Sequence, residues 1–287
     1  MKISIITVCR NSEKTIETTI KSVISQTYKN IEYIVIDGDS KDRTKDIVLS
    51  YGNRISKFVS ESDKSLWEAM NKAIKLATGD FIYFINSDDY IYDRNVIDDV
   101  VTIINKKPEL DFIYGDVEVR QTQGKRIIQK SPTPNEIIES MILRGTIPHV
   151  GSFIEANLFQ TIGLYNENYR LASDYEWITK LIHDPDIKLF YFPRVIASFY
   201  AGGLSSHVQE NLTEIFAVQN YAPIYQTEYW INRRFIALQT ELIEVQRLSD
   251  ERFAFIESTI MGKLLLAIKK GINLLKSVKL FANDRSR

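Results

Sequence analysis

Short apolar runs alternate with amphipathic helical patterns through the first hundred residues, and this alternation is what most constrains the fold. Each run is typical of a strand buried on both faces. The four predicted strands are Ile3–Val8, Ile31–Ile36, Ile55–Val59 and Phe81–Ile85. Ser12 is expected to cap the first of the intervening helices. Strands and helices in alternation form a mostly parallel sheet covered by helices, so we expect an α/β fold.

Polar residues gather at the point where each predicted strand ends. The four clusters are Cys9–Asn11, Asp37–Ser40, Ser60–Asp63 and Asn86–Asp89. The carboxyl ends of parallel strands meet at one edge of an open sheet, and ligands bind there. We therefore expect the functional site at this edge.

Composition and charge exclude several classes of protein. The chain has 287 residues, 44% of them hydrophobic and 25% charged, and a single cysteine, Cys9, so it carries no disulfide framework. Residues 259–287 hold seven basic residues and one acid, whereas the remaining residues hold 29 basic and 36 acidic ones. An acidic body argues against a nucleic-acid partner. The apolar run at Ile3 is too short for a signal peptide, and no stretch is long enough to span a membrane, so we expect a cytoplasmic protein.

Two adjacent carboxylates, Asp88 and Asp89, follow the fourth predicted strand. Their mutual repulsion needs a cation or hydrogen-bond donors nearby. Carboxylate oxygens suit Mg²⁺ or Mn²⁺ bound together with substrate phosphates, and the alternative is a solvated pair in a turn. The chain lacks a Gly-x-Gly-x-x-Gly motif, a phosphate-binding P-loop motif and a Gly-x-Ser-x-Gly motif.

Three further side chains are candidates for the chemistry. Asp174 opens a predicted helix, where an acid is favoured by the helix dipole or could serve as a general base. His149 follows Pro148, and His207 follows a glycine-rich turn. Each histidine is either a structural residue or part of a cleft.

The C-terminal region is predicted to be helical over 207–221, 225–258 and 260–281. A stripe with alternating steps of four and three residues predicts either a helix packed on the body or a homodimer formed through 225–258. Residues 259–287 form a basic amphipathic segment that either docks on the body or lies on an anionic membrane surface. The stripe consists of Ile231, Phe235, Leu238, Leu242 and Val245.

The motifs taken together resemble those of the family 2 glycosyltransferases, enzymes of the GT-A fold that move a sugar from a nucleotide-sugar to an acceptor. The resemblance covers about residues 1–205 and is closest to the bacterial exopolysaccharide, capsule and lipopolysaccharide enzymes. It is carried by Ser4–Asn11, Ser25–Tyr28, Val35–Thr44, Ser60–Asp63, Ala69–Lys72, Gly79–Asp80, Asn86–Asp89 and Asp174.

The resemblance implies a role for each matching residue. Asp174 corresponds to the catalytic base. His149 is expected on the acceptor side because of its place in a possible cleft loop, not because of the resemblance. A divalent cation, Mn²⁺ or Mg²⁺, is expected on Asp88, Asp89 and His207. The residues expected to bind the nucleotide-sugar are Thr7, Arg10, Asn11, Asp37, Asp39, Asp63, Asn71 and Asn86.

The sequence departs from the family pattern at several positions, among them Ser65–Glu68, where the family has Gly-Ile-Tyr-Asp. Gly38 stands where the family has the second acid of its Asp-Asp-Gly-Ser motif. Asn86 replaces the first acid of the Asp-x-Asp motif, and Ser173 replaces the glutamate before the base.

We therefore expect an inverting, metal-dependent hexosyl- or N-acetylhexosaminyltransferase that uses a UDP-sugar and a glycan or lipid-linked acceptor in bacterial surface polysaccharide synthesis. The expected domains are a catalytic domain over 1–205, with a nucleotide-binding half (1–105) and an acceptor half (106–205), a helical extension over 206–258, and the basic segment 259–287. We expect this protein at the inner face of the cell membrane. The alternatives are an inactive nucleotide-sugar-binding scaffold and a nucleotidyltransferase.

Overall fold

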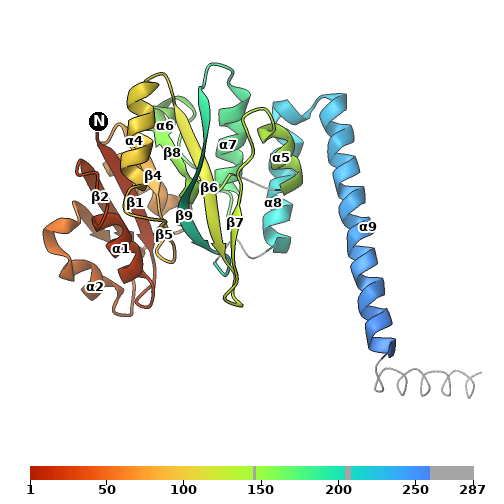
Figure 1. The fold of residues 1–287 in the computed structure, drawn as a ribbon, viewed down its shortest axis with the longest axis horizontal. Helices are drawn as coiled ribbons and strands as arrows, with labels where there is room; N and C mark the ends of the chain where they lie inside the picture. The colour runs from red at the N-terminus through yellow and green to blue at the C-terminus, as the bar shows by residue number, and fades with distance from the viewer. Residues whose placement is uncertain (145–146, 204–207, 259–287) are drawn as a thin grey trace, which may run out of the picture. The chain divides into compact units, whose positions relative to one another are not determined.

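The computed structural model describes residues 1–144, 147–203 and 208–258. Contacts divide the chain into two units, Met1–Thr227 and Glu228–Arg287. The first unit contains a nine-stranded sheet with helices on both faces (Figure 1). This arrangement confirms the predicted α/β fold class.

The strands of the sheet have the order β3-β2-β1-β4-β8-β6-β9-β5, with β7 paired to β6. The first four strands are parallel, as expected from their sequence pattern, and β8 and β6 then join in antiparallel fashion. The strands are β1 (Ile3–Cys9), β2 (Ile31–Asp37), β3 (Lys57–Ser60), β4 (Phe81–Phe84), β5 (Tyr90–Ile91), β6 (Phe112–Arg120), β7 (Arg126–Gln129), β8 (Ser152–Glu155) and β9 (Leu189–Tyr200).

Helices lie on both sides of this sheet because the central strands are apolar on both faces. Along β1, Ile3 and Ile5 pack with the residues of α1, α2 and α4, whereas Ile6 and Val8 pack with α3, α6 and α7. The helices of the first unit are α1 (Ile16–Ile24), α2 (Thr44–Ser50), α3 (Leu66–Leu76), α4 (Val96–Lys106), α5 (Ile137–Arg144), α6 (Leu158–Thr161), α7 (Ser173–His183) and α8 (Val208–Tyr221), with short 3₁₀ turns at Gly52–Arg54, His149–Gly151 and Pro223–Tyr225.

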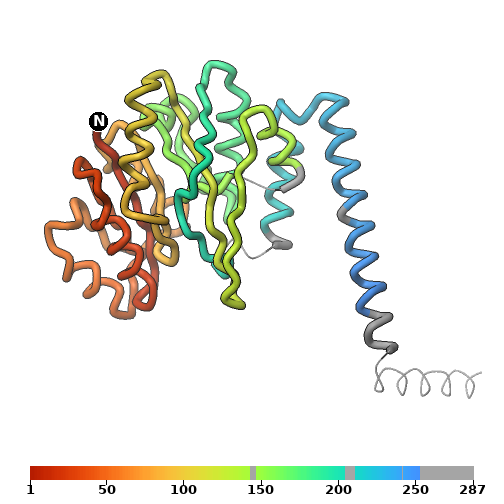
Figure 2. Tube along the Cα trace, in the orientation of Figure 1, coloured from red at the N-terminus to blue at the C-terminus, as the bar shows by residue number. Residues whose placement is uncertain are grey.

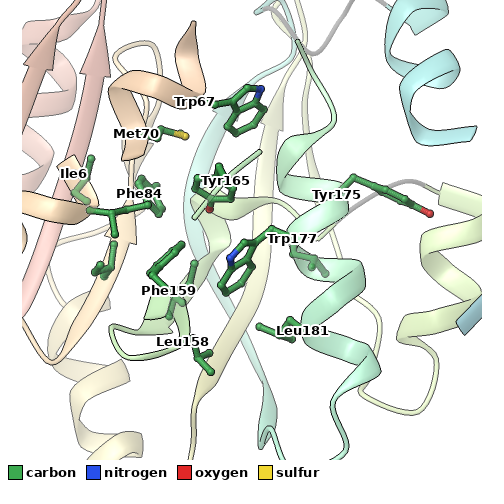
Figure 3. Close-up of a cluster of buried hydrophobic side chains, with 14 of the residues drawn as sticks. Ile6, Trp67, Met70, Phe84, Leu158, Phe159, Tyr165, Tyr175, Trp177 and Leu181 are labelled. Carbon is green, nitrogen blue, oxygen red and sulfur yellow. The ribbon is translucent and has the colours of Figure 1, made fainter. Parts of the chain in front are cut away.

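Aromatic side chains fill the core between the sheet and α7 (Figure 3). Phe159 stacks on Trp177 with ring centroids 4.9 Å apart, and Tyr165 packs against both Trp67 and Trp177. Burial of such large rings contributes much of the packing energy of a domain. The segment that precedes α7 is therefore fixed against α3 on one side and α7 on the other.

The first helix begins later than its sequence predicts. Thr15, not Ser12, is the residue before α1, and its side chain makes no capping hydrogen bond. The Ser12 carbonyl accepts from the N–H groups of Thr15 and Ile16, and the Ser12 hydroxyl lies 2.8 Å from the Ser87 hydroxyl. The expectation that Ser12 caps the helix was wrong because its hydroxyl ties two loops together instead.

Helix α8 packs against α7 and belongs with the first unit by its contacts (Figure 2). Gln219 is buried and donates to the Tyr175 hydroxyl over 2.7 Å, and Val218 joins the core beneath α7. A boundary drawn from the sequence after residue 205 therefore falls before a helix that is integral to this unit.

The second unit is described over a single helix, α9 (Glu228–Ser258), of 31 residues. Many of its described apolar side chains are exposed, with Leu242 at 70% and Val245 at 63% of their full accessible area. Within the described ranges, no helix has the length and apolar character needed to cross a bilayer.

Candidate active site

The ends of β1, β2 and β3 meet at one edge of the sheet, as their polar clusters predict. Cys9 pairs with Asp37, and Asp37 pairs with Ser60, in the parallel registers of the three strands. The Asp37 carboxylate is fully buried between the loops that follow. It accepts hydrogen bonds from the Ser40 N–H over 3.1 Å, from the Ser60 hydroxyl over 2.6 Å, and from the Ser40 hydroxyl. Burial and the nearby Asp37 raise the pKa of the Cys9 thiol.

The loops after β1 and β2 also bind each other. The Asn11 N–H donates to the Ser40 hydroxyl over 2.7 Å, and the Asn11 side-chain oxygen accepts from the Lys41 N–H over 2.9 Å. Asn11 and Asp39 have φ angles of 51° and 58°, a left-handed conformation that Asn and Asp adopt more readily than other non-glycine residues. The exposed Arg10 side chain lies over Gly38, where an added Cβ would be 3.5 Å from its Cδ. Arg10, Asn11 and Asp39 thus stand together at the edge.

Three other predicted nucleotide-sugar ligands are engaged within the protein. Thr7 is buried, with its hydroxyl 3.1 Å from that of Tyr33. The Asn71 amide bonds to both the N–H and the carbonyl of Tyr165, over 3.0 and 2.8 Å. Asp63 pairs with Lys72 over 2.7 Å, while its second oxygen is buried without a partner among the described residues. Contact of these side chains with a ligand stays a prediction.

The adjacent acids Asp88 and Asp89 have different surroundings. Asp89 is buried and accepts from the Tyr200 N–H over 2.7 Å, and its backbone carbonyl accepts from the Thr19 hydroxyl over 2.6 Å. Burial, and then the neighbouring Asp88, raise its pKa well above the ordinary value. Burial also raises the pKa of Asp88, an effect that Arg120 and His149 oppose.

The chemistry of Asp88 suits a divalent cation. Its carboxylate is partly buried and is influenced by the charges of Arg120 and His149. Mg²⁺ and Mn²⁺ are commonly held by one or two carboxylates together with substrate phosphates. The part of the chain that the structure describes contains no group of three or more His, Cys, Asp or Glu side chains that could hold an ion. His207 lies outside the described residues, so its role as a ligand stays a prediction.

Asp174 is linked to the loop after β4 through His149. The Asp174 carboxylate lies near the start of α7, where Oδ1 accepts from the Tyr175 N–H over 2.7 Å. Its Oδ2 lies 3.5 Å from His149 Nδ1, and His149 Nε2 lies 3.0 Å from the Asn86 amide nitrogen. The same amide nitrogen lies 3.4 Å from Asp89 Oδ2. Because an Asn amide nitrogen only donates, His149 Nε2 accepts and Nδ1 carries the proton toward Asp174.

Arg120, at the end of β6, is a site residue that the sequence analysis missed. Its guanidinium lies 3.8 Å from Asp89 Oδ1 and stacks on the Tyr90 ring at 4.7 Å. It places a positive charge behind the two acids, which partly compensates their repulsion. A lone arginine carries no motif, so the pairing of β6 with β9 was needed to find it.

The family profile and the similar sequences among known proteins agree with one another. The profile described as "Glycosyl transferase family 2" matches residues 4–166. A "PGL/p-HBAD biosynthesis glycosyltransferase" of Mycobacterium bovis BCG is 28% identical over 209 residues, which cover 71% of this chain and 79% of that protein. An uncharacterized glycosyltransferase of Rickettsia felis is 33% identical over 189 residues, which cover 63% of this chain and 31% of that one.

Solved structures share the fold. The crystal structure of S. aureus TarS 1–349 in complex with UDP-GlcNAc has a TM-score of 0.63 at 20% identity, over 82% of this chain and 73% of that chain. In a longer TarS structure the match covers 44% of that chain. The mannosyltransferase PcManGT of Pyrobaculum calidifontis, in complex with GDP-Man and Mn²⁺, has a TM-score of 0.58 at 15% identity, over 98% of this chain and 82% of that one. The chain belongs to glycosyl transferase family 2 and is a glycosyltransferase.

Proposed function

We propose that this enzyme transfers a hexosyl or N-acetylhexosaminyl group from a UDP-sugar to a glycan or lipid-linked acceptor in bacterial surface polysaccharide synthesis, with inversion at the anomeric carbon. One observation carries the proposal: in the loop after β4, which contains Asp88, a chain of contacts from Asp89 runs through Asn86 and His149 to Asp174 at the start of α7. Asp88 is thus available to bind a metal ion, and Asp174 is available to accept a proton.

On the donor side, Asp88 would hold Mn²⁺ or Mg²⁺ against the diphosphate. A divalent cation bound there would neutralise the negative charge that develops on the leaving nucleoside diphosphate. Asp89, with its oxygens engaged by Tyr200 and Asn86, supports the loop that carries Asp88. Arg10, Asn11 and Asp39 form the rim on which the nucleotide would rest.

On the acceptor side, Asp174 would act as the general base. As the acceptor oxygen forms its bond to the anomeric carbon, the bond from that carbon to the phosphate oxygen breaks. The electron pair of the broken bond leaves with UDP, and the acceptor proton moves to the Asp174 carboxylate. His149 donates to the same carboxylate, which supports an orienting role for it beside the acceptor.

Two solved structures with a similar fold support a nucleotide-sugar donor but do not identify the sugar. TarS 1–349 was solved with UDP-GlcNAc, and PcManGT was solved with GDP-Man and Mn²⁺. Both are nucleotide-sugar complexes, and the second includes a divalent cation. We infer the uridine donor from the motif resemblance, so a test has to separate uridine from guanosine nucleotides.

Calorimetric titration with UDP, UDP-GlcNAc and GDP, each with Mn²⁺ and with EDTA, tests the donor assignment. We expect Mn²⁺-dependent binding of the uridine nucleotides that Asp88→Asn abolishes. Asp46→Asn, an exposed acid of α2, is the matched control and should bind like the wild type. Preference for GDP would overturn the uridine donor, and equal binding in EDTA would overturn the metal site.

For α9 we propose a homodimer contact within 225–258. The stripe at Ile231, Phe235, Leu238, Leu242 and Val245 is exposed along a helix of coiled-coil spacing. Sedimentation velocity should show a dimer that Leu242→Glu dissociates. Ile243→Glu lies off the stripe at similar exposure and should leave it intact. A monomeric wild type contradicts this contact.

For residues 259–287, which lie outside the described residues, we propose binding to an anionic membrane surface at the inner face of the cell membrane. Seven basic residues and one acid favour electrostatic attraction to anionic lipid. Full-length protein should sediment with phosphatidylglycerol vesicles and not with neutral phosphatidylcholine vesicles. Deletion of 259–287 should abolish this sedimentation, and an unchanged bound fraction contradicts the proposal.

A further inference from the structure

Three consecutive backbone N–H groups just before α7 converge on one carboxylate. Glu214, in the middle of α8, accepts from the Arg170 N–H over 2.8 Å through Oε1. Its Oε2 accepts from the N–H groups of Leu171 and Ala172, over 2.7 and 2.8 Å. Successive N–H groups arranged in this way form a concave site for an anion. Here the anion is a side chain from a helix more than 40 residues further along the chain.

The first turn of α7 carries two acids of its own, Asp174 and Glu176, and the Glu214 carboxylate adds to their negative charge. The residue before the helix is Ala172, which has no side chain able to cap it. Negative charge at a helix N-terminus is favoured by the helix dipole, and Glu214 provides it from outside. The chain direction that leads into Ser173 and Asp174 is therefore set by a contact with α8.

The opposite side of the same segment is held by α3. Trp67 donates from its indole nitrogen to the Arg170 carbonyl over 3.1 Å. Asn71 bonds to Tyr165 and, over 2.9 Å, to the Glu167 carboxylate. The backbone of Arg170 is thus hydrogen-bonded on both sides, with its carbonyl accepting from α3 and its N–H donating to α8. Asp174 follows four residues later.

We propose that Glu214 is a positioning residue for the transfer reaction, which fixes the start of α7 and with it the Asp174 carboxylate relative to His149. Glu214 acts through the backbone of residues 170–172 and touches neither donor nor acceptor. This inference rests on the proposed role of Asp174 as the base. It assigns to α8, a helix beyond the matched family region 4–166, a part in the chemistry.

The test compares Glu214→Gln with Gln219→Leu on the same helix. Glu214→Gln keeps the size of the side chain but removes its charge and one acceptor oxygen. Gln219→Leu removes the contact of α8 with the Tyr175 hydroxyl and leaves the Glu214 contacts in place. The probe is hydrolysis of UDP-GlcNAc, UDP-glucose and GDP-mannose by the full-length protein with Mn²⁺, in which water replaces the acceptor.

We expect Glu214→Gln to lower kcat by about tenfold to a hundredfold, because small displacements of a catalytic group are costly. Its KM for the donor should stay within about twofold of the wild type, since donor contacts are untouched. Glu214→Asp should recover part of the lost kcat. Gln219→Leu should change thermal stability at least as much but leave kcat within about twofold. Wild-type kcat in Glu214→Gln, or equal losses in both variants, overturns the inference.

Asp174→Asn, measured in parallel, separates this inference from the proposed function. Loss of turnover in Asp174→Asn but not in Glu214→Gln overturns the positioning role alone, whereas turnover retained in Asp174→Asn overturns the base and the positioning role together. Amide hydrogen exchange gives a readout that needs no turnover. Glu214→Gln should speed exchange at residues 170–174 while the rest of α7 keeps its protection, and unchanged exchange there overturns the contact.

Discussion

The candidate site has two parts that are held in different ways. The donor wall consists of the loops after β1, β2 and β3, and the base wall is the segment that leads into Asp174. On the donor wall, loops that follow neighbouring parallel strands bind one another directly, with Asp37 between Ser40 and Ser60. On the base wall, the segment before Asp174 is held by α3 and α8, which lie far from it in the sequence. The donor wall is therefore a local product of the β1–β4 topology, whereas the base wall exists only after distant helices have packed.

The largest expected effect is on the base wall. Asp174→Asn should lower donor hydrolysis or transfer by about 10²–10⁴-fold, because the amide cannot accept the proton. Binding of the uridine nucleotide should not change. Steady-state rates and calorimetric titration measure the two quantities separately. Turnover near that of the wild type would remove Asp174 from the mechanism.

Substitution of Asp37, the acid at the centre of the hydrogen bonds between the loops, tests the donor wall. Asp37→Ala should lower the free energy of unfolding by about 3 kcal/mol, because it leaves the buried Ser40 hydroxyl and the half-buried Ser60 hydroxyl without their charged acceptor. Asp39→Ala is the matched control, since this acid is solvent-accessible and pairs with Lys41 at the surface. Urea denaturation should show a clear loss for the first variant and little change for the second. Similar stabilities would contradict the local network.

A third prediction concerns pH and the opposite end of the donor half. Burial alone would raise the pKa of Glu32, but hydrogen bonds from Lys57, Ser4 and Thr78 lower it from 4.5 to about 2. A lowered pKa contributes stability above pH 4.5, which is lost as pH falls toward 2. Glu32→Gln should therefore cost about 2–3 kcal/mol at pH 7. The difference from wild type in urea denaturation should shrink steadily below pH 4.5, and a constant difference would contradict this pKa.

The smallest expected effect is that of removing His149, which links Asp174 to the loop after β4. His149→Ala should lower turnover by about tenfold, since Asp174 keeps its place on α7 but loses one orienting contact. In the Asp174→Asn background the same change should cost little more, because the carboxylate that His149 orients is already absent. Fully additive losses in this double-mutant cycle would show that His149 acts independently, for example on the acceptor.

The difference between the walls explains what the sequence could predict. The apolar runs of β1, β2 and β4 and the polar clusters after them are contiguous, so their pattern predicts both the sheet and the edge. Asp88 and Asp174 became candidates from their places after the fourth predicted strand and at the start of a predicted helix, and the family resemblance then gave each its expected role. Arg120 and Glu214 were missed because each gains its role from a tertiary contact, with Asp89 and with residues 170–172. The spacing of residues along one element holds no trace of such contacts.

The network around Asp37 has a thermodynamic consequence for the nucleotide site that we propose at these loops. Fixing the backbone of a flexible residue costs about 1–2 kcal/mol in entropy. Asn11 and Asp39 already hold unusual backbone angles, and their loops are bonded to each other through Ser40 and Lys41. A ligand that binds a preorganised loop is spared this ordering cost. Substitutions that loosen the network should therefore weaken nucleotide affinity even where every side chain that contacts the nucleotide is retained.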